Sequence, residues 1–179
     1  LGHRWQPNGD WSLDTALFYN VYDDLRTIEA GSRIANGMQG NTYGVELSSR
    51  WQLRPDLRLD AGYTLMRMDL ELEPPSSDPV EPGATEGASP HHQFTLRTEW
   101  DVKRDLEFDV TLRYVDALPA QQVPAYTTMD VGLGWRIGRG FDLVVVGQNL
   151  FDSHHPEQRS ATIVNEVQRG FYTKLNWRF

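Results

Sequence analysis

Two pairs of adjacent histidines are the side chains of this sequence best suited to bind a ligand: His91 and His92, and His154 and His155. Neutral imidazoles bind transition metals, and aspartate and glutamate are frequent just before the first pair. Adjacent residues of a strand point to opposite faces, so each pair can give a shared site one ligand at most. We therefore expect these histidines to be polar residues at the bases of loops, with ligand binding as the alternative, and we predict no metal site.

Arginines and carboxylates at alternate positions form a second set of candidates. Arg50, Arg97, Arg113 and Arg136 are placed to contact an anionic ligand or another domain of the protein, and Arg97 and Arg113 are the two predicted to bind the ligand. Paired carboxylates can transfer protons. Charged rows of this kind also serve solvation and cross-strand pairing, which we expect to be their main role. The sequence has no nucleophile elbow, phosphate-binding loop or metalloprotease motif and no cysteine, so neither an enzyme nor a cofactor is predicted. The formal net charge of −8 argues against a nucleic-acid-binding surface.

The elements that carry these side chains are predicted from an alternation of apolar and polar residues with a period of two. No apolar run approaches the roughly 20 residues that a membrane helix needs, and the mean hydropathy is −0.54. Such alternation is typical of membrane-spanning strands, in which one face meets lipid and the other meets water. The predicted strands cover residues 11–22, 43–53, 57–65, 94–102, 106–114, 129–137, 141–149 and 170–179, with a remnant at 1–6.

Short and long connections alternate between these strands. Tight turns are predicted at residues 7–10, 54–56, 103–105 and 138–140, and longer polar connections at 24–42, 71–89, 117–125 and 153–165. In bacterial outer-membrane barrels the short turns face the periplasm and the long loops face outside. We expect the same orientation here, with a periplasmic carboxy terminus. The 71–89 loop is rich in proline, glutamate, serine and glycine, a composition that predicts mobility.

Aromatic residues are sorted between the two ends of the predicted strands. Tryptophans lie near the predicted periplasmic ends and most tyrosines near the opposite ends, as expected for girdles at two membrane interfaces. The predicted periplasmic girdle consists of Trp11, Trp51, Trp100, Trp135, Trp177 and Phe179. The last strand also resembles the terminal strand of bacterial outer-membrane barrels, whose final aromatic residue is part of an assembly signal. That resemblance implies the barrel-assembly machinery as a partner and assigns the signal to Phe171, Leu175, Trp177 and Phe179.

Together these features predict an all-β fold, an antiparallel up-and-down transmembrane β-barrel segment in contact with outer-membrane lipid. The count of about eight complete strands plus a remnant is odd, whereas bacterial single-chain barrels have even numbers. Residues 1–179 are therefore interpreted as the carboxy-terminal segment of a larger barrel, separated from its earlier strands and from its export signal. Two alternatives are a self-contained small barrel, acting as adhesin, anchor or narrow pore, and a soluble all-β binding module.

The motif Asn149-Leu150-Phe151-Asp152, about thirty residues before the end, resembles an element near the end of TonB-dependent outer-membrane receptors. Similar pieces occur in order at residues 18–20, 22–25, 43–47, 89–92 and 123–130. The resemblance implies a barrel of about 22 strands, closed by an amino-terminal plug domain that these residues do not include.

The same resemblance implies a location in the outer membrane of a Gram-negative bacterium. The implied activity is uptake of a scarce nutrient, most commonly a ferric siderophore, with energy passed from TonB through the plug. The implied partners are the receptor's own plug domain, TonB and a ferric siderophore or similar small ligand. Contact with that ligand is expected at the extracellular side or in the lumen, where the candidates are His91, His92, His154, His155, Arg97 and Arg113.

Overall fold

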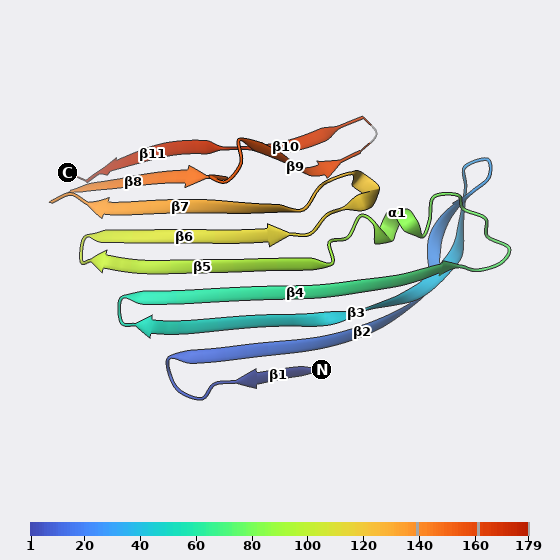
Figure 1. The fold of residues 1–179 in the computed structure, drawn as a ribbon, viewed down its shortest axis with the longest axis horizontal. Helices are drawn as coiled ribbons and strands as arrows, with labels where there is room; N and C mark the ends of the chain where they lie inside the picture. The colour runs from blue at the N-terminus through green and yellow to red at the C-terminus, as the bar shows by residue number, and fades with distance from the viewer. Residues whose placement is uncertain (139, 161, 179) are drawn as a thin grey trace.

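Most of the chain lies in one antiparallel sheet, shown in Figure 1. The computed structural model describes residues 1–138, 140–160 and 162–178. The sheet contains nine strands in the order β1-β2-β3-β4-β5-β6-β7-β8-β11, and β9 and β10 form a separate two-stranded sheet. No helix in these ranges is long and apolar enough to cross a membrane.

The strand bounds agree with the prediction to within about two residues at the tight-turn ends. At the opposite ends β2 to β7 extend beyond the prediction, whereas β8 and β11 do not. The strands of the large sheet are β1 (Gly2–Trp5), β2 (Trp11–Glu29), β3 (Arg33–Arg54), β4 (Leu57–Leu72), β5 (His92–Lys103), β6 (Leu106–Val115), β7 (Tyr126–Arg136), β8 (Phe141–Gln148) and β11 (Gly170–Trp177). The remaining elements are α1 (Gly83–Glu86), the 3-10 turn η1 (Pro119–Gln121), β9 (His154–Arg159) and β10 (Val164–Gln168).

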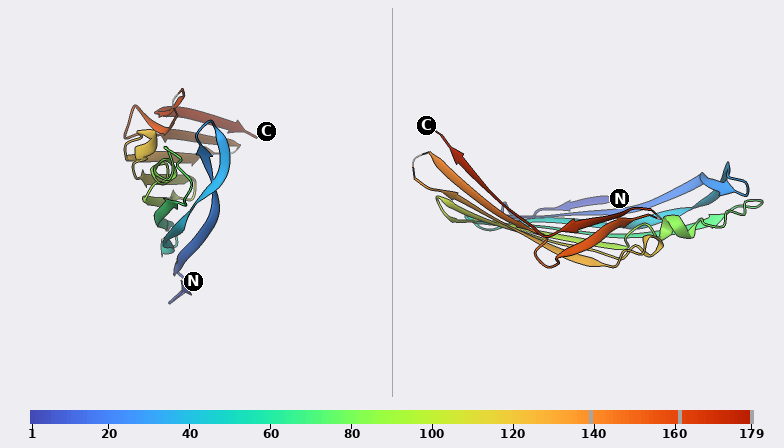
Figure 2. Two further views of the ribbon diagram at one scale, coloured as in Figure 1. Left: turned by 90° about the vertical axis from the view of Figure 1, so that its right-hand side faces the viewer. Right: turned by 90° about the horizontal axis from the view of Figure 1, so that it is seen from above.

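The large sheet is a curved single layer with two free ends (Figure 2). Each strand from β1 to β7 pairs with the next strand of the chain, and β8 pairs with β11. The predicted all-β, up-and-down antiparallel fold is thus confirmed. β1 and β11 are not neighbours in the sheet, so the described residues do not close on themselves as the small-barrel alternative requires.

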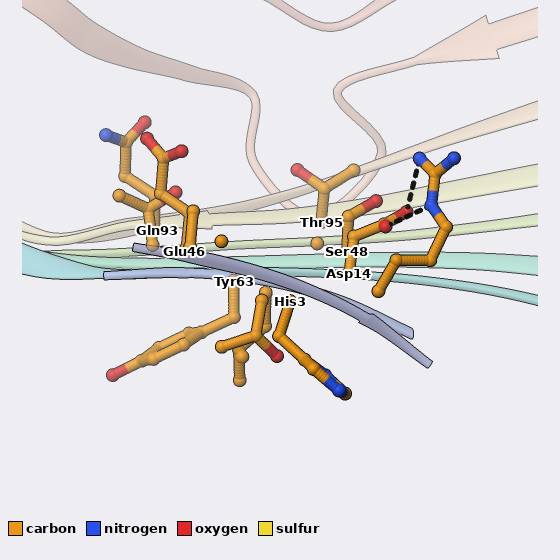
Figure 3. A pocket seen from close by; sticks show the side chains of 14 residues that line it. His3, Asp14, Glu46, Ser48, Tyr63, Gln93 and Thr95 are labelled. Atoms are coloured by element: carbon orange, nitrogen blue, oxygen red, sulfur yellow. Dashed lines mark hydrogen bonds and ion pairs between the residues drawn. The ribbon is translucent and has the colours of Figure 1, made fainter. Parts of the chain in front are cut away.

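Side chains alternate between two chemically different faces, as the period of two predicts. In Figure 3, Tyr63 and His3 project from one side of the sheet, while Asp14, Glu46 and Ser48 project from the other. We call the side that carries Tyr63 the apolar face and the side that carries Glu46 the polar face. The apolar face carries many exposed large side chains, including Leu17, Val21, Trp51, Trp100 and Leu175, of which Leu175 is 61% exposed.

Tryptophans form a row across the apolar face at the tight-turn end of the sheet. Trp11 is paired with Trp51 across β2 and β3, and Phe141 is paired with Trp177 across β8 and β11. The rings of the second pair stack with centroids 5.7 Å apart. Trp100 and Trp135 lie at the same end, opposite the first residues of β4 and β6. The row follows from register, because each tight turn returns the chain to the same edge of the sheet.

Two connections predicted as polar loops are instead largely strand. β2 and β3 remain paired from Leu25 with Met38 to Glu29 with Arg33, after a bulge at Asp24. Residues 153–165 contain β9 and the beginning of β10. The prediction was wrong here because apolar and polar residues alternate in the sequence only where the two faces of a strand differ in polarity. A hairpin that meets water on both sides keeps its backbone pairing without that signal.

The 71–89 segment, predicted to be a mobile loop, is tied to the β2–β3 hairpin. The Asp78 carboxylate is buried and accepts a 2.6 Å hydrogen bond from the amide of Ile28. The Glu29 carboxylate accepts hydrogen bonds from the Ser76 hydroxyl at 2.6 Å and from the Ser77 amide at 3.0 Å. Composition alone predicts too little apolar burial to order this segment, but charge-assisted hydrogen bonds supply the contacts that composition does not reveal.

These carboxylates make the attachment sensitive to acid. The amide of Ile28 lowers the pKa of Asp78 below its ordinary value of 3.8, and the Ser76 hydroxyl lowers the pKa of Glu29 below 4.5. A carboxyl with a depressed folded pKa stabilises the fold above its unfolded pKa, and this contribution is lost as pH falls through the folded value. We expect the segment to stay attached at neutral pH and to detach progressively below about pH 4.

Hydrogen exchange at the Ile28 amide, corrected for the intrinsic pH dependence of exchange, measures this attachment. Asp78→Ala should accelerate exchange roughly tenfold at neutral pH, because the amide loses its charged acceptor. The control is Asp69→Ala, which removes an exposed carboxyl of β4 that has no side-chain hydrogen bond among the described residues. Equal exchange in the parent and in Asp78→Ala would contradict the proposed attachment.

Candidate functional site

A row of ion pairs crosses the polar face from β3 to β5. Arg50 lies 2.6 Å from Asp60, and Arg58 lies 3.0 Å from the same carboxylate. Arg58 also contacts Glu99 across the β4–β5 pair. A single exposed pair contributes little to stability, but shared partners that hold each other in place make a rigid, hydrated wall. The polar face therefore carries charge that is largely neutralised within the sheet.

The two arginines predicted to bind an anionic ligand lie in different surroundings. Arg97 ends the ion-pair row, with its guanidinium 3.0 Å from Glu99. Arg113 lies on the polar face of β6, is exposed, and makes no hydrogen bond or ion pair within the ranges that the structure covers. Its charge acts on Tyr126 of the adjacent strand β7. Of the two, Arg113 is the cation left available to a ligand.

A hollow of about 710 Å³ lies on the sheet from β1 to β5. On the polar face its lining includes Asp14, Glu46, Ser48 and Thr95, which point to the same side in Figure 3. Gly62 lies among them and adds no side chain. Small polar residues between the Asp14 and Glu46 carboxylates leave this part of the wall hollow, as a surface that receives a polar ligand or another part of a protein would be.

His91 and His92 lie together at the start of β5, opposite Leu65 and Met66 in the middle of β4. His92 makes a 2.8 Å hydrogen bond through Nδ1 with the Tyr63 hydroxyl. His91 contacts the guanidinium of Arg67 through Nδ1. Tyr63 and Arg67 both belong to the apolar-face register of β4, so neither imidazole makes its contact on the polar face. Alternation does not separate this pair, because the paired part of β5 begins at His92.

His154 and His155 point to different surroundings, as alternation along β9 predicts. His154 is exposed and lies 3.1 Å from the Ser153 hydroxyl. His155 is only 5% exposed, and its ring stacks on Tyr126 with centroids 4.4 Å apart. Its Nε2 lies 3.5 Å from the Glu157 carboxylate. Of the candidate residues, the structure therefore brings His155 and Arg113 into one region, because Tyr126 interacts with both. The other three candidate histidines make their contacts with other residues.

Tyr126 and Glu157 were not among the predicted ligand-binding residues. Glu157 is two residues from His155, a spacing that regular alternation would put on one side, although in the structure residue 157 is the unpaired residue of a β-bulge. That spacing was visible in the sequence, but residues 153–165 were predicted to be a loop, for which no face can be assigned. Tyr126 belongs to a separate strand. Identifying it from the sequence would have required knowing how the β9–β10 hairpin packs.

The Asn149–Asp152 motif attaches the β9–β10 hairpin to the large sheet. Asn149 is buried, has a left-handed backbone with φ of 54°, and donates through its side chain to the Val167 carbonyl at 3.0 Å. Its amide donates to the Asp130 carboxylate at 2.8 Å. The motif is therefore a structural connection between β8, β7 and β10 rather than a ligand contact.

Of the residues predicted to form the girdle and the assembly signal, those described on β11 are strongly exposed, whereas Trp11 is only partly exposed. Phe171 is 72% exposed and Trp177 is 63% exposed, both on the apolar face of β11. Phe179 lies outside the described residues. Exposure of this kind is compatible with lipid contact, and the girdle and assembly roles stay predictions.

No catalytic or metal-binding cluster was predicted. Within residues 1–138, 140–160 and 162–178, no three His, Cys, Asp or Glu side chains lie close enough to hold a metal ion together. The charged side chains on the polar face from β3 to β5 pair with one another, and the role of this face in ligand binding stays a prediction.

Comparison with known proteins gives relatives along the whole chain. The chain is 25% identical over 188 aligned residues to the pesticin receptor of Yersinia pestis, covering 99% of the chain and 28% of the relative. It is 23% identical over 167 residues to the catecholate siderophore receptor Fiu of Escherichia coli K12, covering 87% of the chain and 21% of the relative. The chain thus spans less than a third of the length of these relatives.

Solved structures share the fold. The siderophore receptor PiuA of Acinetobacter baumannii superimposes with a TM-score of 0.77 at 19% identity, over 98% of this chain and 27% of that one. The closed form of the ferric-catecholate import receptor Fiu of E. coli K12 gives a TM-score of 0.75 at 22% identity, and the match covers 99% of this chain and 27% of that one. The family model described as TonB dependent receptor-like, beta-barrel, matches residues 1–150. The chain therefore belongs to the TonB-dependent receptor β-barrel family.

Proposed function

We propose that this chain forms part of the barrel wall and of the extracellular ligand vestibule of an outer-membrane receptor for a ferric siderophore. The observation that carries the proposal is the difference between the two faces of the sheet. The apolar face leaves large side chains such as Tyr19 (65%) and Val21 (63%) exposed, which suits lipid. The ion-paired polar face suits a hydrated lumen. Family membership and the named specificities of the relatives supply the ligand class.

The proposed orientation puts the tight turns and β11's end in the periplasm. The long ends of β2 and β3, the 73–91 segment and the β9–β10 hairpin then face the outside. In this arrangement the polar face meets an amino-terminal plug, and energy for uptake comes through that plug from TonB. Assembly in the outer membrane proceeds through the barrel-assembly machinery, with β11 as the recognised strand. The open edges of β1 and β11 join strands of the remaining barrel, because unpaired edges are not tolerated in lipid.

Uptake of radioactive iron by cells under iron limitation tests this function. A strain without the full-length receptor should lose uptake of one class of ferric chelate, tested with ferric catecholates and with ferric chelates of other donor chemistry separately. Re-expression of the full-length gene should restore it. Undiminished uptake of every chelate in the deletion strain, with no other receptor able to replace it, would refute the siderophore proposal.

Arg113 is expected to contribute to ligand affinity, because it is the exposed and unpaired cation of the pair predicted from the sequence. Arg113→Ala should weaken binding of an anionic ferric chelate roughly tenfold, the loss of one charge-assisted hydrogen bond. Arg97→Ala is the matched control, since the Arg97 guanidinium is already held by Glu99. Equal affinity of both variants and the parent in equilibrium binding would remove Arg113 from the ligand site.

A further inference from the structure

His155 has an unusual environment for a buried histidine. The side chain is 5% exposed, and neither Nδ1 nor Nε2 has a hydrogen-bond partner among the described residues. Buried polar atoms are nearly always hydrogen-bonded, so an imidazole with two unpartnered nitrogens requires an explanation. Its stacking on Tyr126, at 4.4 Å between ring centroids, fixes the plane of the ring but satisfies neither nitrogen.

The position of Glu157 supplies that explanation. Its Oε1 lies 3.5 Å from Nε2 of His155, which is longer than a good hydrogen bond. A nitrogen and an oxygen bound to one zinc ion at about 2.1 Å each, with a near-tetrahedral angle, lie about 3.4 Å apart. The observed separation matches the spacing of two ligands on one metal. Residue 157 has no pairing partner, because it lies in a β-bulge between the Pro156–Glu166 and Gln158–Asn165 pairs, and a bulge re-aims a side chain.

A third donor and an entrance are present at the same place. The Tyr126 hydroxyl faces the Glu157 carboxylate. Glu157 is the accessible member, with 34% of its side chain exposed, so an ion reaches the imidazole past this carboxylate. Imidazole nitrogen together with carboxylate oxygen suits zinc, copper and nickel.

We propose that His155, Glu157 and Tyr126 form a binding site for a divalent transition-metal ion at the junction of the β9–β10 hairpin with β7. Within the described ranges no third His, Cys, Asp or Glu joins it, so its donors are one nitrogen and two oxygens. The Arg113 guanidinium, whose charge acts on Tyr126, opposes a doubly charged ion. Binding is consequently exchangeable, unlike that of a permanent structural metal. This inference is independent of the siderophore proposal.

Equilibrium titration of zinc chloride into the full-length receptor tests the site. The protein is purified in detergent without a histidine tag and treated with a chelator beforehand. We expect His155→Ala to remove one zinc site or to weaken it at least roughly tenfold. The matched control is His154→Ala, which changes the exposed neighbour and should leave that site intact.

A second variant keeps the test valid if His155→Ala disturbs the hairpin. Glu157→Gln retains the size of the side chain and the imidazole, and should also weaken zinc binding at least roughly tenfold. Copper(II) bound to the parent should show coupling to nitrogen in its electron paramagnetic resonance spectrum. In His155→Ala the coupling to one of these nitrogens should be lost. The proposal is overturned if the parent binds no zinc, if His155→Ala and Glu157→Gln bind it like the parent, or if His154→Ala alone removes the site.

Discussion

Replacing Gly44 by alanine is expected to destabilise the folded barrel by about 1–3 kcal/mol, the usual cost of overpacking. Gly44 is paired with Phe18 across β2 and β3. A Cβ at this position would collide with the backbone carbonyl of Leu65 and would lie 2.7 Å from Cζ of Phe18. The Phe18 ring can turn away, but the carbonyl belongs to the β3–β4 pairing and cannot move without breaking it. Glycine is therefore required here by the close approach of a neighbouring strand.

The fraction of full-length receptor that keeps its folded mobility in gel electrophoresis, measured against urea concentration, gives this loss of stability. Gly62→Ala is the matched control, since Gly62 lies on the adjacent strand and the nearest atom to its added Cβ is 4.0 Å away. It should be neutral or slightly stabilising, because alanine restricts the unfolded chain. Similar midpoints for Gly44→Ala and Gly62→Ala would show that the crowding at Gly44 is relieved by small shifts.

Replacing Asn149 by alanine is expected to loosen the β9–β10 hairpin by about 2–3 kcal/mol in total. A left-handed backbone costs a residue such as alanine about 1–2 kcal/mol, and Asn149 has a φ of 54°. The lost hydrogen bond to the Val167 carbonyl adds about 1 kcal/mol. Asparagine is suited to both requirements, because it tolerates this conformation and its side chain reaches a nearby carbonyl.

Asn149→Gly separates the two contributions. Glycine adopts the left-handed conformation freely, so this variant should lose only the side-chain hydrogen bond, and its effect should be about 1 kcal/mol. Hydrogen exchange of the β9 and β10 amides in the full-length receptor measures the attachment in all three proteins. An order other than parent, glycine, alanine in decreasing protection would contradict this role of Asn149.

The strands near the tight turns were predictable because each of them has one apolar and one polar face. The Trp11–Trp51 and Phe141–Trp177 pairs illustrate this, since short turns fix the register and register places the aromatic rings in one row. Beyond Asp24 the two faces of the β2–β3 hairpin are no longer different in polarity. The alternation disappears there, although the backbone pairing continues to Glu29.

The candidate site was predictable only in part, for a related reason. Each histidine was visible as a candidate, but its partner depended on contacts between separate strands. Burial of His155 comes from the packing of β9 against Tyr126 of β7, which no local pattern encodes. The segment around Asp78 is similar, because its order depends on the amide of Ile28, fifty residues away in the chain.

The unequal lengths of the strands have a consequence for the approach of large molecules. β3 has 22 residues, whereas β5 has 12 and β8 has 8. At about 3.3 Å per residue, β3 is roughly 30 Å longer than β5. If all tight turns lie at one level, the rim of this wall is slanted rather than level. With that rim facing outward, as proposed, large molecules would meet the tall side at β2 to β4 first, and a small solute would enter most directly over the low side, above β5 and β6.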